Sequence, residues 1–406
     1  MSDAPSTARA VVIGCGIVGN SLAYHLTRLG WTDIVLLDKG PLPNPGGSTG
    51  HASNFIFLVD HSKEMTQLTL DSVRQYREMD VFTECGGIEV ARTEERMEEL
   101  RRRMASAKAW GIEPVSLVTP AEIKELVPYI DESILLGGFH TPGVGVVDSL
   151  RAGTIMRERG IESGGLTVLP NTEVNALGVE GDRIRRVKTS KGTIEAETVI
   201  VACGVWSPLL AGMAGARIPL VPMVHQMIDV GPVPRFEKST RAIEFPIVRD
   251  MDVFMYERQD GTSLEIGSYA HRSIVHDPEE IPSIDLCAYE PISRLVPSWR
   301  SYMKTSMSRT IGNSIARELF SNRGTGPTSI IWCTIGTSGM CAPAIAASSG
   351  LQTPQATTTV SASIVPFDVS TRRIRPPSTP RAWTSVFGRT VIPPDSMPCW
   401  RMIVPA

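Results

Sequence analysis

The chain has 406 residues with a formal net charge of −3, and 6% of its residues are aromatic. That length allows two or three packed units, and the near-balanced charge excludes the strongly basic surface of nucleic-acid-binding proteins. No stretch reaches the roughly 20 apolar residues of a membrane span, and the first residues lack the apolar core of a signal peptide. Seven dispersed cysteines without a CxxC pair argue against a disulfide framework or a zinc site, so we expect a cytoplasmic protein with no bound metal.

The chain begins with a strand, a glycine-rich turn, a helix and a second strand. The first apolar strand leads into Gly14-x-Gly16-x-x-Gly19, and the second ends at Asp38. This order is the fingerprint of a dinucleotide-binding fold, in which Gly14 allows the tight turn, Gly16 lets the backbone approach the pyrophosphate and Gly19 lets the helix pack on the strand. The helix N-terminus offers N–H groups to the phosphates. The carboxylate of Asp38, with Lys39 beside it, is placed to accept the ribose hydroxyls.

The next segment, residues 40–52, is predicted to be a loop from its composition. It contains Gly46-Gly-Ser-Thr-Gly-His51. The chain order places this loop at the carboxyl edge of the expected sheet. A loop of small residues there can lie against an isoalloxazine ring, with the hydroxyls of Ser48 and Thr49 reaching phosphate or ring atoms. The glycine fingerprint alone does not separate NAD from FAD, but this loop favours FAD. A NAD-dependent dehydrogenase on the same fold is the weaker alternative.

Helical and strand patterns alternate through the middle of the chain. Helices are predicted over residues 62–80, 93–109 and 149–163, and a further helix starts at Thr119. The predicted strands are 166–169, 173–179, 184–189, 196–203, 220–230, 243–248, 252–258 and 263–269. The strand at 196–203 runs into Gly204, whose turn is expected to pass close to the cofactor. This order indicates an α/β protein, with a Rossmann-like FAD-binding domain interrupted by an α+β substrate domain on an antiparallel sheet.

Six motifs between residue 9 and about residue 287 resemble the flavin domain of dimethylglycine oxidases and, more broadly, the dimethylglycine and sarcosine dehydrogenases of the D-amino-acid-oxidase superfamily. In chain order they are Gly14-Cys-Gly-Ile-Val-Gly19, Gly46-Gly-Ser-Thr-Gly-His51-Ala, Ala109-Trp-Gly-Ile112, Ile200-Val-Ala-Cys-Gly-Val-Trp206, Pro222-Met-Val-His225-Gln and Ile266-Gly-Ser-Tyr-Ala-His-Arg272. The resemblance implies FAD as the cofactor and a fold of the glutathione-reductase/D-amino-acid-oxidase type. The cofactor-binding residues that it implies are Gly14, Gly16, Gly19, Asp38, Lys39, Ser48, Thr49, His51, Val174, Gly204 and Trp206.

His51 has a particular role in this resemblance. In the relatives, the histidine of the Gly-Ser-Thr-x-His segment is joined covalently to the 8α-methyl carbon of the flavin, which implies covalent FAD through His51. The alternative is that His51 is a polar loop residue. The sequence departs from the relatives here, because residues 50–55 read Gly-His-Ala-Ser-Asn-Phe where relatives tend to have a small residue and Pro-Gly-Leu. The departure leaves the histidine in place but changes the residues that set the backbone path of the loop.

The resemblance also implies a substrate and two residues that bind it. Relatives oxidise small N-methylated amino acids of the dimethylglycine or sarcosine class by moving a hydride to flavin N5, which leaves an iminium, and oxygen or an electron-transfer partner reoxidises the flavin. His225 in an apolar strand and Tyr256 on a neighbouring strand match the histidine and tyrosine of the family's substrate site. Histidine can exchange a proton near neutral pH, and a tyrosine hydroxyl can hydrogen-bond a carboxylate or an amine. A packing role in the core is the alternative for each residue.

The sequence changes character near residue 288. Through Glu290 there are 28 Lys+Arg and 40 Asp+Glu, whereas from Pro291 onward there are 12 basic and 3 acidic residues. Ser, Thr, Pro and Arg become abundant, none of the six motifs lies there, and residues 330–335 are the one segment that suggests a strand. We expect an atypical or disordered tail, and a shifted reading frame is our hypothesis for its composition.

These observations predict the division of the chain and its function. The FAD-binding domain is expected over residues 1–85 and 140–219, the substrate domain over 86–139 and 220–287, and the tail over 288–406. The predicted function is FAD-dependent oxidation of the C–N bond of a small N-methylated amino acid. Because the tail replaces a part that relatives use at the flavin, the alternative is a catalytically inactive nucleotide-binding remnant.

Overall fold

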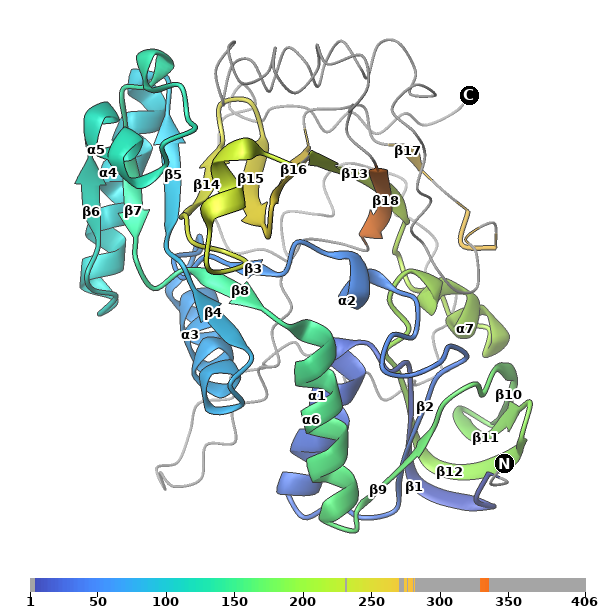
Figure 1. The fold of residues 1–406 in the computed structure, drawn as a ribbon. Helices are drawn as coiled ribbons and strands as arrows, with labels where there is room; N and C mark the ends of the chain where they lie inside the picture. The colour runs from blue at the N-terminus through green and yellow to red at the C-terminus, as the bar shows by residue number, and fades with distance from the viewer. Residues whose placement is uncertain are drawn as a thin grey trace, which may run out of the picture.

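The computed structural model describes residues 4–230, 232–269, 274–275, 277–279, 281 and 329–335, and for residues 224–226, 228, 274 and 329–335 it describes the backbone alone. The strands of this part of the chain form three sheets. Figure 1 shows the two larger sheets in different halves of the molecule, with the short helix α2 (Ser48–His51) between them.

The first sheet is built around parallel strands and has the described order β10-β11-β12-β1-β2-β9. Its strands are β1 (Thr7–Ile13), β2 (Ile34–Leu37), β9 (Leu166–Leu169), β10 (Val174–Glu180), β11 (Arg183–Thr189) and β12 (Gly192–Val201). β12, β1, β2 and β9 pair in parallel, whereas β10, β11 and β12 form an antiparallel meander. Parallel strands covered on both faces are apolar along their length, and all four residues of β2 are buried.

The second sheet draws its nine described strands from two distant parts of the chain, in the order β17-β13-β16-β15-β14-β5-β7-β6, with β18 also paired to β13. The first part supplies β5 (Gly87–Ala91), β6 (Ser116–Val118) and β7 (Gly137–Thr141). The second part supplies β13 (Met223–Val230), β14 (Ile247–Asp250), β15 (Met255–Asp260), β16 (Ser263–Ser268), β17 (Ile274–Val275) and β18 (Ser329–Ile335). β14 and β5 join the two parts through the parallel pair of this sheet.

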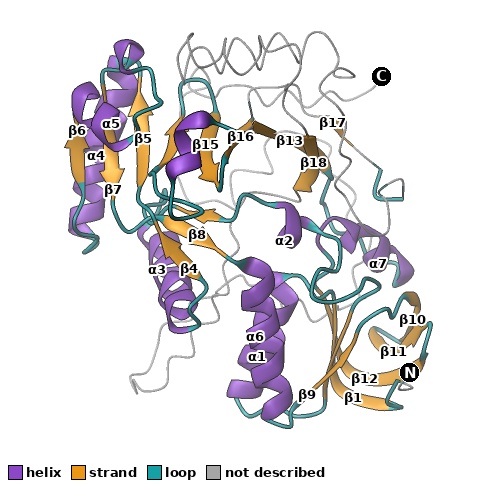
Figure 2. Ribbon diagram, in the orientation of Figure 1, coloured by secondary structure: helices purple, strands orange, loops and turns teal. Residues whose placement is uncertain are grey.

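A small third sheet and the helices complete the described structure (Figure 2). The sheet has the order β3-β8-β4, with β3 (Phe55–Ile56), β4 (Phe82–Glu84) and β8 (Gly145–Val147). The remaining α-helices are α1 (Ile17–Arg28), α3 (Lys63–Glu78), α4 (Glu94–Ala109), α5 (Pro120–Leu126), α6 (Ser149–Glu162) and α7 (Ser207–Met213). α1 and α6 lie side by side next to the first sheet. None of the described helices combines the length and the apolar character that a membrane crossing requires.

Most predicted elements are present with small shifts in their ends, but several short strands were missed. The predicted strand at 166–169 is β9, and the expected strand near 330–335 is β18, whose backbone pairs antiparallel with β13. β4 to β8 were not predicted, because strands of three to five residues give too little alternation to detect. The segment 40–52 is not entirely a loop, since it contains α2. The predicted domain boundaries stay a prediction.

Candidate active site

The glycine turn after β1 is packed so closely that a side chain has no room. Gly14 has a φ of +115°, and a Cβ there would lie 2.4 Å from the carbonyl oxygen of Ala202. A Cβ on Gly19 would lie 1.9 Å from the carbonyl oxygen of Gly14, so α1 rests directly on the turn. Such contacts admit glycine and exclude larger residues.

The N-terminus of α1 is open toward a ligand. Gly16 is its N-cap and makes no side-chain cap of its own. The N–H of Ile17 donates to Oγ1 of Thr49 at 3.0 Å, which ties the second small-residue motif to the first. Val18 in the same turn is 55% exposed, and helix N-termini bind phosphates in many folds.

Asp38, at the end of β2, lies against the same turn. One of its carboxylate oxygens accepts from the N–H of Cys15 at 2.6 Å, and the other accepts from the N–H of Gly40 at 2.8 Å. Burial raises the pKa of Asp38, and the two N–H donors oppose that rise. Each carboxylate oxygen retains acceptor capacity, so the side chain can also accept ribose hydroxyls.

Lys39 and Trp206 contact each other next to this carboxylate. The Lys39 Nζ lies 4.0 Å from the centre of the Trp206 ring, a cation–π contact, and burial lowers the pKa of Lys39. Gly204 has a φ of +54° and begins the 3₁₀ turn that ends at Trp206. The Trp206 Nε1 is buried and has no hydrogen-bond partner among the described residues, which leaves an N–H donor for a bound molecule.

The second motif forms α2, which packs against α6. The hydroxyl of Ser149 donates to the carbonyl of Thr49 at 2.6 Å, and a Cβ on Gly47, the N-cap of α2, would lie 3.7 Å from the Trp206 ring. Ser48 begins this helix and His51, which is half-buried, ends it. The fold therefore brings the glycine turn, Asp38, Lys39, Trp206 and the small-residue motif to one edge of the first sheet.

Val174 is placed differently from the other predicted cofactor residues. Its side chain is 9% exposed and packs in the apolar core of the first sheet, together with Leu169 and Leu177. Val174 begins β10 two residues after Thr172, whose N–H donates to the carbonyl of Asp38 at 2.7 Å. A contact with the cofactor at this strand end stays a prediction.

A row of paired residues, most of them with polar or charged side chains, crosses the second sheet. The register pairs Glu89 of β5 with Arg249 of β14, Arg249 with Tyr256 of β15, Tyr256 with Gly267 of β16, and Gly267 with Met227 of β13. Residues that lie opposite each other on paired strands share a face of the sheet. A carboxylate, a guanidinium, a phenol and a thioether therefore follow one another on one face.

Tyr256 lies across Gly267 of the neighbouring strand. The order of the strands also corrects the expectation that His225 and Tyr256 lie on neighbouring strands. β13 and β15 are not neighbours, because β16 lies between them, so His225 and Tyr256 are two strands apart. A Cβ on Gly267 would lie 2.0 Å from Cζ of Tyr256, so the missing side chain lets the phenol extend over β16. The hydroxyl of Ser53 lies 3.0 Å from the Tyr256 hydroxyl and 3.2 Å from Sδ of Met227, which fixes the far end of the ring.

A cavity of about 440 Å³ lies beside this row of residues. Its lining includes Ala52, the residue directly after His51. The segment after α2 contributes its lining at one side, and β14, β15 and α4 contribute the other. The other lining residues include Ser53, Phe57, Asp60, Arg103, Arg249 and Tyr256. Concave, largely apolar sites with a few convergent polar groups are typical of small-molecule binding.

For His225, the predicted substrate-site histidine, the structure describes the backbone alone. The backbone of His225 lies in β13 and pairs with Cys333 of β18, while its side chain lies outside the described residues. The substrate-site role of His225 stays a prediction.

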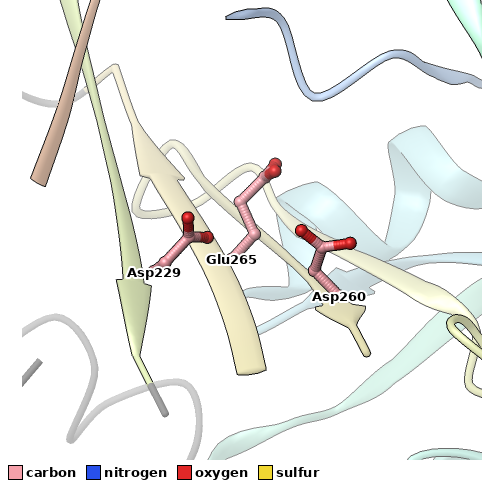
Figure 3. Close-up of side chains that lie close together, drawn as sticks. All are labelled: Asp229, Asp260 and Glu265. Atoms are coloured by element: carbon pink, nitrogen blue, oxygen red, sulfur yellow. The ribbon is translucent and has the colours of Figure 1, made fainter. Parts of the chain in front are cut away.

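Three acidic side chains gather at the opposite end of the same strands (Figure 3). Asp229, Asp260 and Glu265 each place a carboxylate oxygen within 4.8 Å of the others. Burial and the neighbouring carboxylates raise the pKa of Asp229 to about 6. Arg258 lies 2.6 Å from Glu265 and 3.4 Å from Asp260, so its guanidinium already compensates two of the three acids.

Sequence reasoning missed Glu89, Arg249, Gly267 and Ser53. The signal for Gly267 was available, because a glycine inside a predicted strand marks a close approach of another group. The other three gave no local signal, since the significance of Glu89 and Arg249 comes from strand pairing between distant segments and that of Ser53 from its contact with the distant Tyr256.

Comparison with known proteins places this chain in a family. Residues 9–329 match the model of the family described as FAD dependent oxidoreductase (DAO). The chain belongs to the FAD dependent oxidoreductase family. The match runs past residue 287, where we expected the resemblance to end, and it includes part of the segment of altered composition.

The curated relatives are about 30% identical to the chain. The mitochondrial dimethylglycine dehydrogenase of Rattus norvegicus is 30% identical over 64% of this chain and 31% of its own length. The mitochondrial sarcosine dehydrogenase of Homo sapiens is 31% identical over 65% and 29% of the two lengths, respectively. The 4-methylaminobutanoate oxidase (formaldehyde-forming) of Paenarthrobacter nicotinovorans is 31% identical over 71% and 35%. The chain thus spans about a third of the length of these relatives.

Solved structures share the fold. The L-proline dehydrogenase from P. horikoshii superimposes with a TM-score of 0.67 at 23% identity and covers 83% of each chain. The glycine oxidase from Geobacillus kaustophilus has a TM-score of 0.61 at 20% identity, over 82% of this chain and 84% of its own. At these identities the likeness concerns the fold alone.

The residues of this chain fit FAD, the cofactor of the family. The cradle at Gly14 and Gly19 excludes side chains from the turn, the N-cap residue Gly16 of α1 makes no side-chain cap, and Asp38 offers carboxylate oxygens beside it. The buried Nε1 of Trp206 supplies a donor without a described partner. These groups match a diphosphate, a ribose and a polar ring edge.

Proposed function

We propose that the protein oxidises the C–N bond of a small N-methylated amino acid, of the dimethylglycine or sarcosine class, with FAD as the electron acceptor. The observation that carries this proposal is the cavity beside Tyr256, which begins one residue after His51 and so adjoins the cofactor-binding edge of the first sheet. The relatives named for dimethylglycine, sarcosine and 4-methylaminobutanoate support the substrate class. Bound FAD supplies the two-electron chemistry that removes a hydride from the carbon next to nitrogen.

The chain's own residues bind and orient the amine in this proposal. Tyr256 is 4% exposed, and Ser53 holds its hydroxyl at the cavity, where it can hydrogen-bond a substrate carboxylate or amine. His225 is proposed to accept the proton of the protonated amine, because imidazole is the side chain that titrates near neutral pH. The aromatic lining from Phe55 and Phe57 limits water around the reacting carbon.

We also propose that His51 bonds covalently to the 8α-methyl carbon of the flavin. Its position at the end of α2, next to the residues that contact the glycine turn, supports this assignment. The test is acid precipitation of the purified protein. Flavin absorbance is expected to stay with the precipitate in the wild type and to be released from His51→Ala. His61→Ala, at an exposed position ten residues further along the chain, is the matched control and is expected to retain the flavin.

Anaerobic mixing with candidate amines tests the reaction. The 450 nm flavin band is expected to bleach with dimethylglycine, sarcosine or 4-methylaminobutanoate and not with glycine or proline. Readmission of oxygen then distinguishes direct reoxidation by oxygen from a need for an electron-transfer partner. Bound flavin that no N-methyl amine reduces would instead support the alternative of a nucleotide-binding protein without catalysis.

A further inference from the structure

The backbone of Cys15, in the middle of the glycine turn, is held by two side chains. Nδ2 of Asn20, on α1, donates to the Cys15 carbonyl at 2.7 Å, and Asn20 is 2% exposed. The N–H of Cys15 donates to the carboxylate of Asp38 at 2.6 Å. The two peptide groups that flank the Cα of Cys15 are therefore both fixed in orientation.

A buried arginine on the neighbouring helix fixes the amide of Asn20. Nη1 of Arg157, on α6, donates to Oδ1 of Asn20 at 3.1 Å, and Nη2 donates to Oγ1 of Thr154 at 2.8 Å. Arg157 is 6% exposed and forms no ion pair with a side chain that the structure describes. A guanidinium has donors only, so the Asn20 atom that faces it must be the oxygen. The amide nitrogen is thereby turned toward the Cys15 carbonyl.

Gly153 provides the space in which this pair of side chains lies. It is a buried residue inside α6, where glycine is a poor helix former. A Cβ on Gly153 would lie 2.6 Å from Nδ2 of Asn20 and 3.4 Å from Nη1 of Arg157. The helix therefore carries a residue that weakens it locally and that leaves room for the contact between Asn20 and Arg157.

The hold on the Cys15 carbonyl determines where the next backbone N–H points. The peptide bond between Cys15 and Gly16 is trans, and the C=O and N–H of a trans peptide point in opposite directions. The carbonyl points at Asn20, so the N–H of Gly16 points away from Asn20, and it has no hydrogen-bond partner in the described part of the chain. Gly16 is the N-cap of α1, the helix whose N-terminus is expected to meet the diphosphate.

We propose that Asn20 and Arg157 are positioning residues for the diphosphate of FAD. Arg157 orients the amide of Asn20, Asn20 holds the Cys15 carbonyl toward α1, and the N–H of Gly16 is left to donate to a phosphate oxygen. A carbonyl that pointed at the phosphate would repel it, whereas an N–H fixed in advance binds without the cost of ordering the turn. The inference concerns retention of the cofactor, so it does not depend on which amine is oxidised.

The first experiment measures nucleotide binding by the full-length protein after removal of flavin. His51→Ala is the background, so that flavin can be removed whether or not His51 bonds to it. FAD binding is followed by flavin fluorescence, and ADP and adenosine are titrated as competitors. Asn20→Leu is expected to weaken the binding of FAD and ADP by about 10-fold. The binding of adenosine, which has no phosphate, is expected to stay as in the background.

Variants of Arg157 show whether it acts through Asn20. Arg157→Met is expected to weaken ADP binding, and Arg157→Gln, which keeps an N–H donor without the charge, is expected to recover part of the loss. Asn20→Leu combined with Arg157→Met should bind ADP as Asn20→Leu alone does, because residues that act through one another are not additive. Arg159→Met, at an exposed position of the same helix, is the matched control and should bind ADP as the background does.

Three outcomes would overturn the proposal. ADP affinity in Asn20→Leu equal to that of the background would remove the role of Asn20. Equal weakening of ADP and adenosine would show that the pair only packs α1 against α6. Recovery in Arg157→Lys but not in Arg157→Gln would mean that charge acts without Asn20. Thermal unfolding identifies the variants that fold, and Arg157→Gln, the mildest change, decides the matter if Asn20→Leu does not.

Discussion

At the scale of single residues, two glycines shape the two halves of the site. Gly14 lets the chain turn under α1 with a backbone conformation that L residues rarely adopt, and the fingerprint in the sequence predicted this role. Gly267 leaves the space over which the Tyr256 ring lies. Its role follows from pairing between β15 and β16, and the sequence showed just a glycine inside a strand.

Substitution of Gly267 by alanine should displace Tyr256. The new Cβ would lie 2.0 Å from Cζ of the ring, so the phenol must leave its place beside Ser53, and overpacking of this kind costs about 1–3 kcal/mol of stability. We expect anaerobic reduction by dimethylglycine to weaken at least 10-fold while flavin content is retained. Gly212→Ala, at an open position in α7, is the control and should leave both measurements as in the wild type. An unchanged reduction rate in Gly267→Ala would contradict the role of Tyr256.

Substitution of Gly14 by alanine should abolish retention of FAD. The added Cβ would lie 2.4 Å from the carbonyl oxygen of Ala202, and the φ of +115° is strained for alanine. The turn must therefore shift away from the phosphate-binding geometry. The ratio of absorbance at 450 nm to that at 280 nm after gel filtration measures the loss, and a ratio equal to that of Gly212→Ala would refute it.

At the scale of elements, local signals predicted helices well and short strands poorly. Thr119 and Pro120 predicted the start of α5, and the structure adds a reciprocal capping box between Thr119 and Glu122. β6 and β7 gave no such signal, because each is short and depends on pairing with strands elsewhere in the chain. The start and end of a helix can be predicted largely from its own residues, whereas a short strand forms only where it pairs with other strands.

Loss of the α5 cap should lower stability without affecting the flavin. In Thr119→Ala the hydroxyl that accepts from the N–H of Glu122 is absent, and loss of such a cap costs about 1 kcal/mol. Urea unfolding followed by circular dichroism should show a lower midpoint with the same slope. Ser116→Ala, at an exposed position of β6, is the comparison variant. A drop in flavin content in Thr119→Ala would mean that α5 acts on the cofactor site, contrary to this prediction.

At the scale of the whole molecule, the second sheet unites strands from residues 87–141 with strands from residues 223–275 and 329–335. It also buries acidic groups on the face opposite to the cavity. Glu257 follows Tyr256 on β15 and is 1% exposed, and neither carboxylate oxygen has a hydrogen-bond partner among the described residues. Burial, and then the charge of Asp250, raise the pKa of Glu257 to about 8. The fully buried Tyr129 also has a raised pKa, through burial and then the charge of Glu257.

This buried glutamate should make the protein less stable as the pH rises. The pKa of Glu257 is higher in the folded chain, about 8, than its ordinary value of 4.5, so the folded state binds the proton more tightly. The resulting stability is fully present below pH 4.5 and is lost as the pH rises through about 8. Asp229, whose pKa is raised to about 6, acts in the same direction at lower pH.

Replacement of Glu257 by glutamine should therefore flatten the pH dependence. The wild type is expected to lose up to about 1.4 kcal/mol of unfolding free energy per pH unit from this one proton, and Glu257→Gln should be the more stable protein at pH 8 and similar at pH 4.5. Urea unfolding at pH 4.5, 6.5 and 8 measures the slopes. Glu98→Gln on the exposed face of α4 is the matched control, and equal slopes for wild type and Glu257→Gln would rule out the buried charge as the cause.

The proposed cofactor-binding edge could be predicted from the sequence, because the glycine turn, its helix and Asp38 belong to one βαβ segment and each obeys a local steric or hydrogen-bonding rule. The proposed substrate cavity could be recognised only from the tertiary structure. Glu89, Arg249, Tyr256 and Gly267 stand in one row because β5 pairs in parallel with β14 and because β16 lies between β15 and β13. Strand register depends on the packing of whole sheet faces, so no single segment contains the information that brings these four residues together.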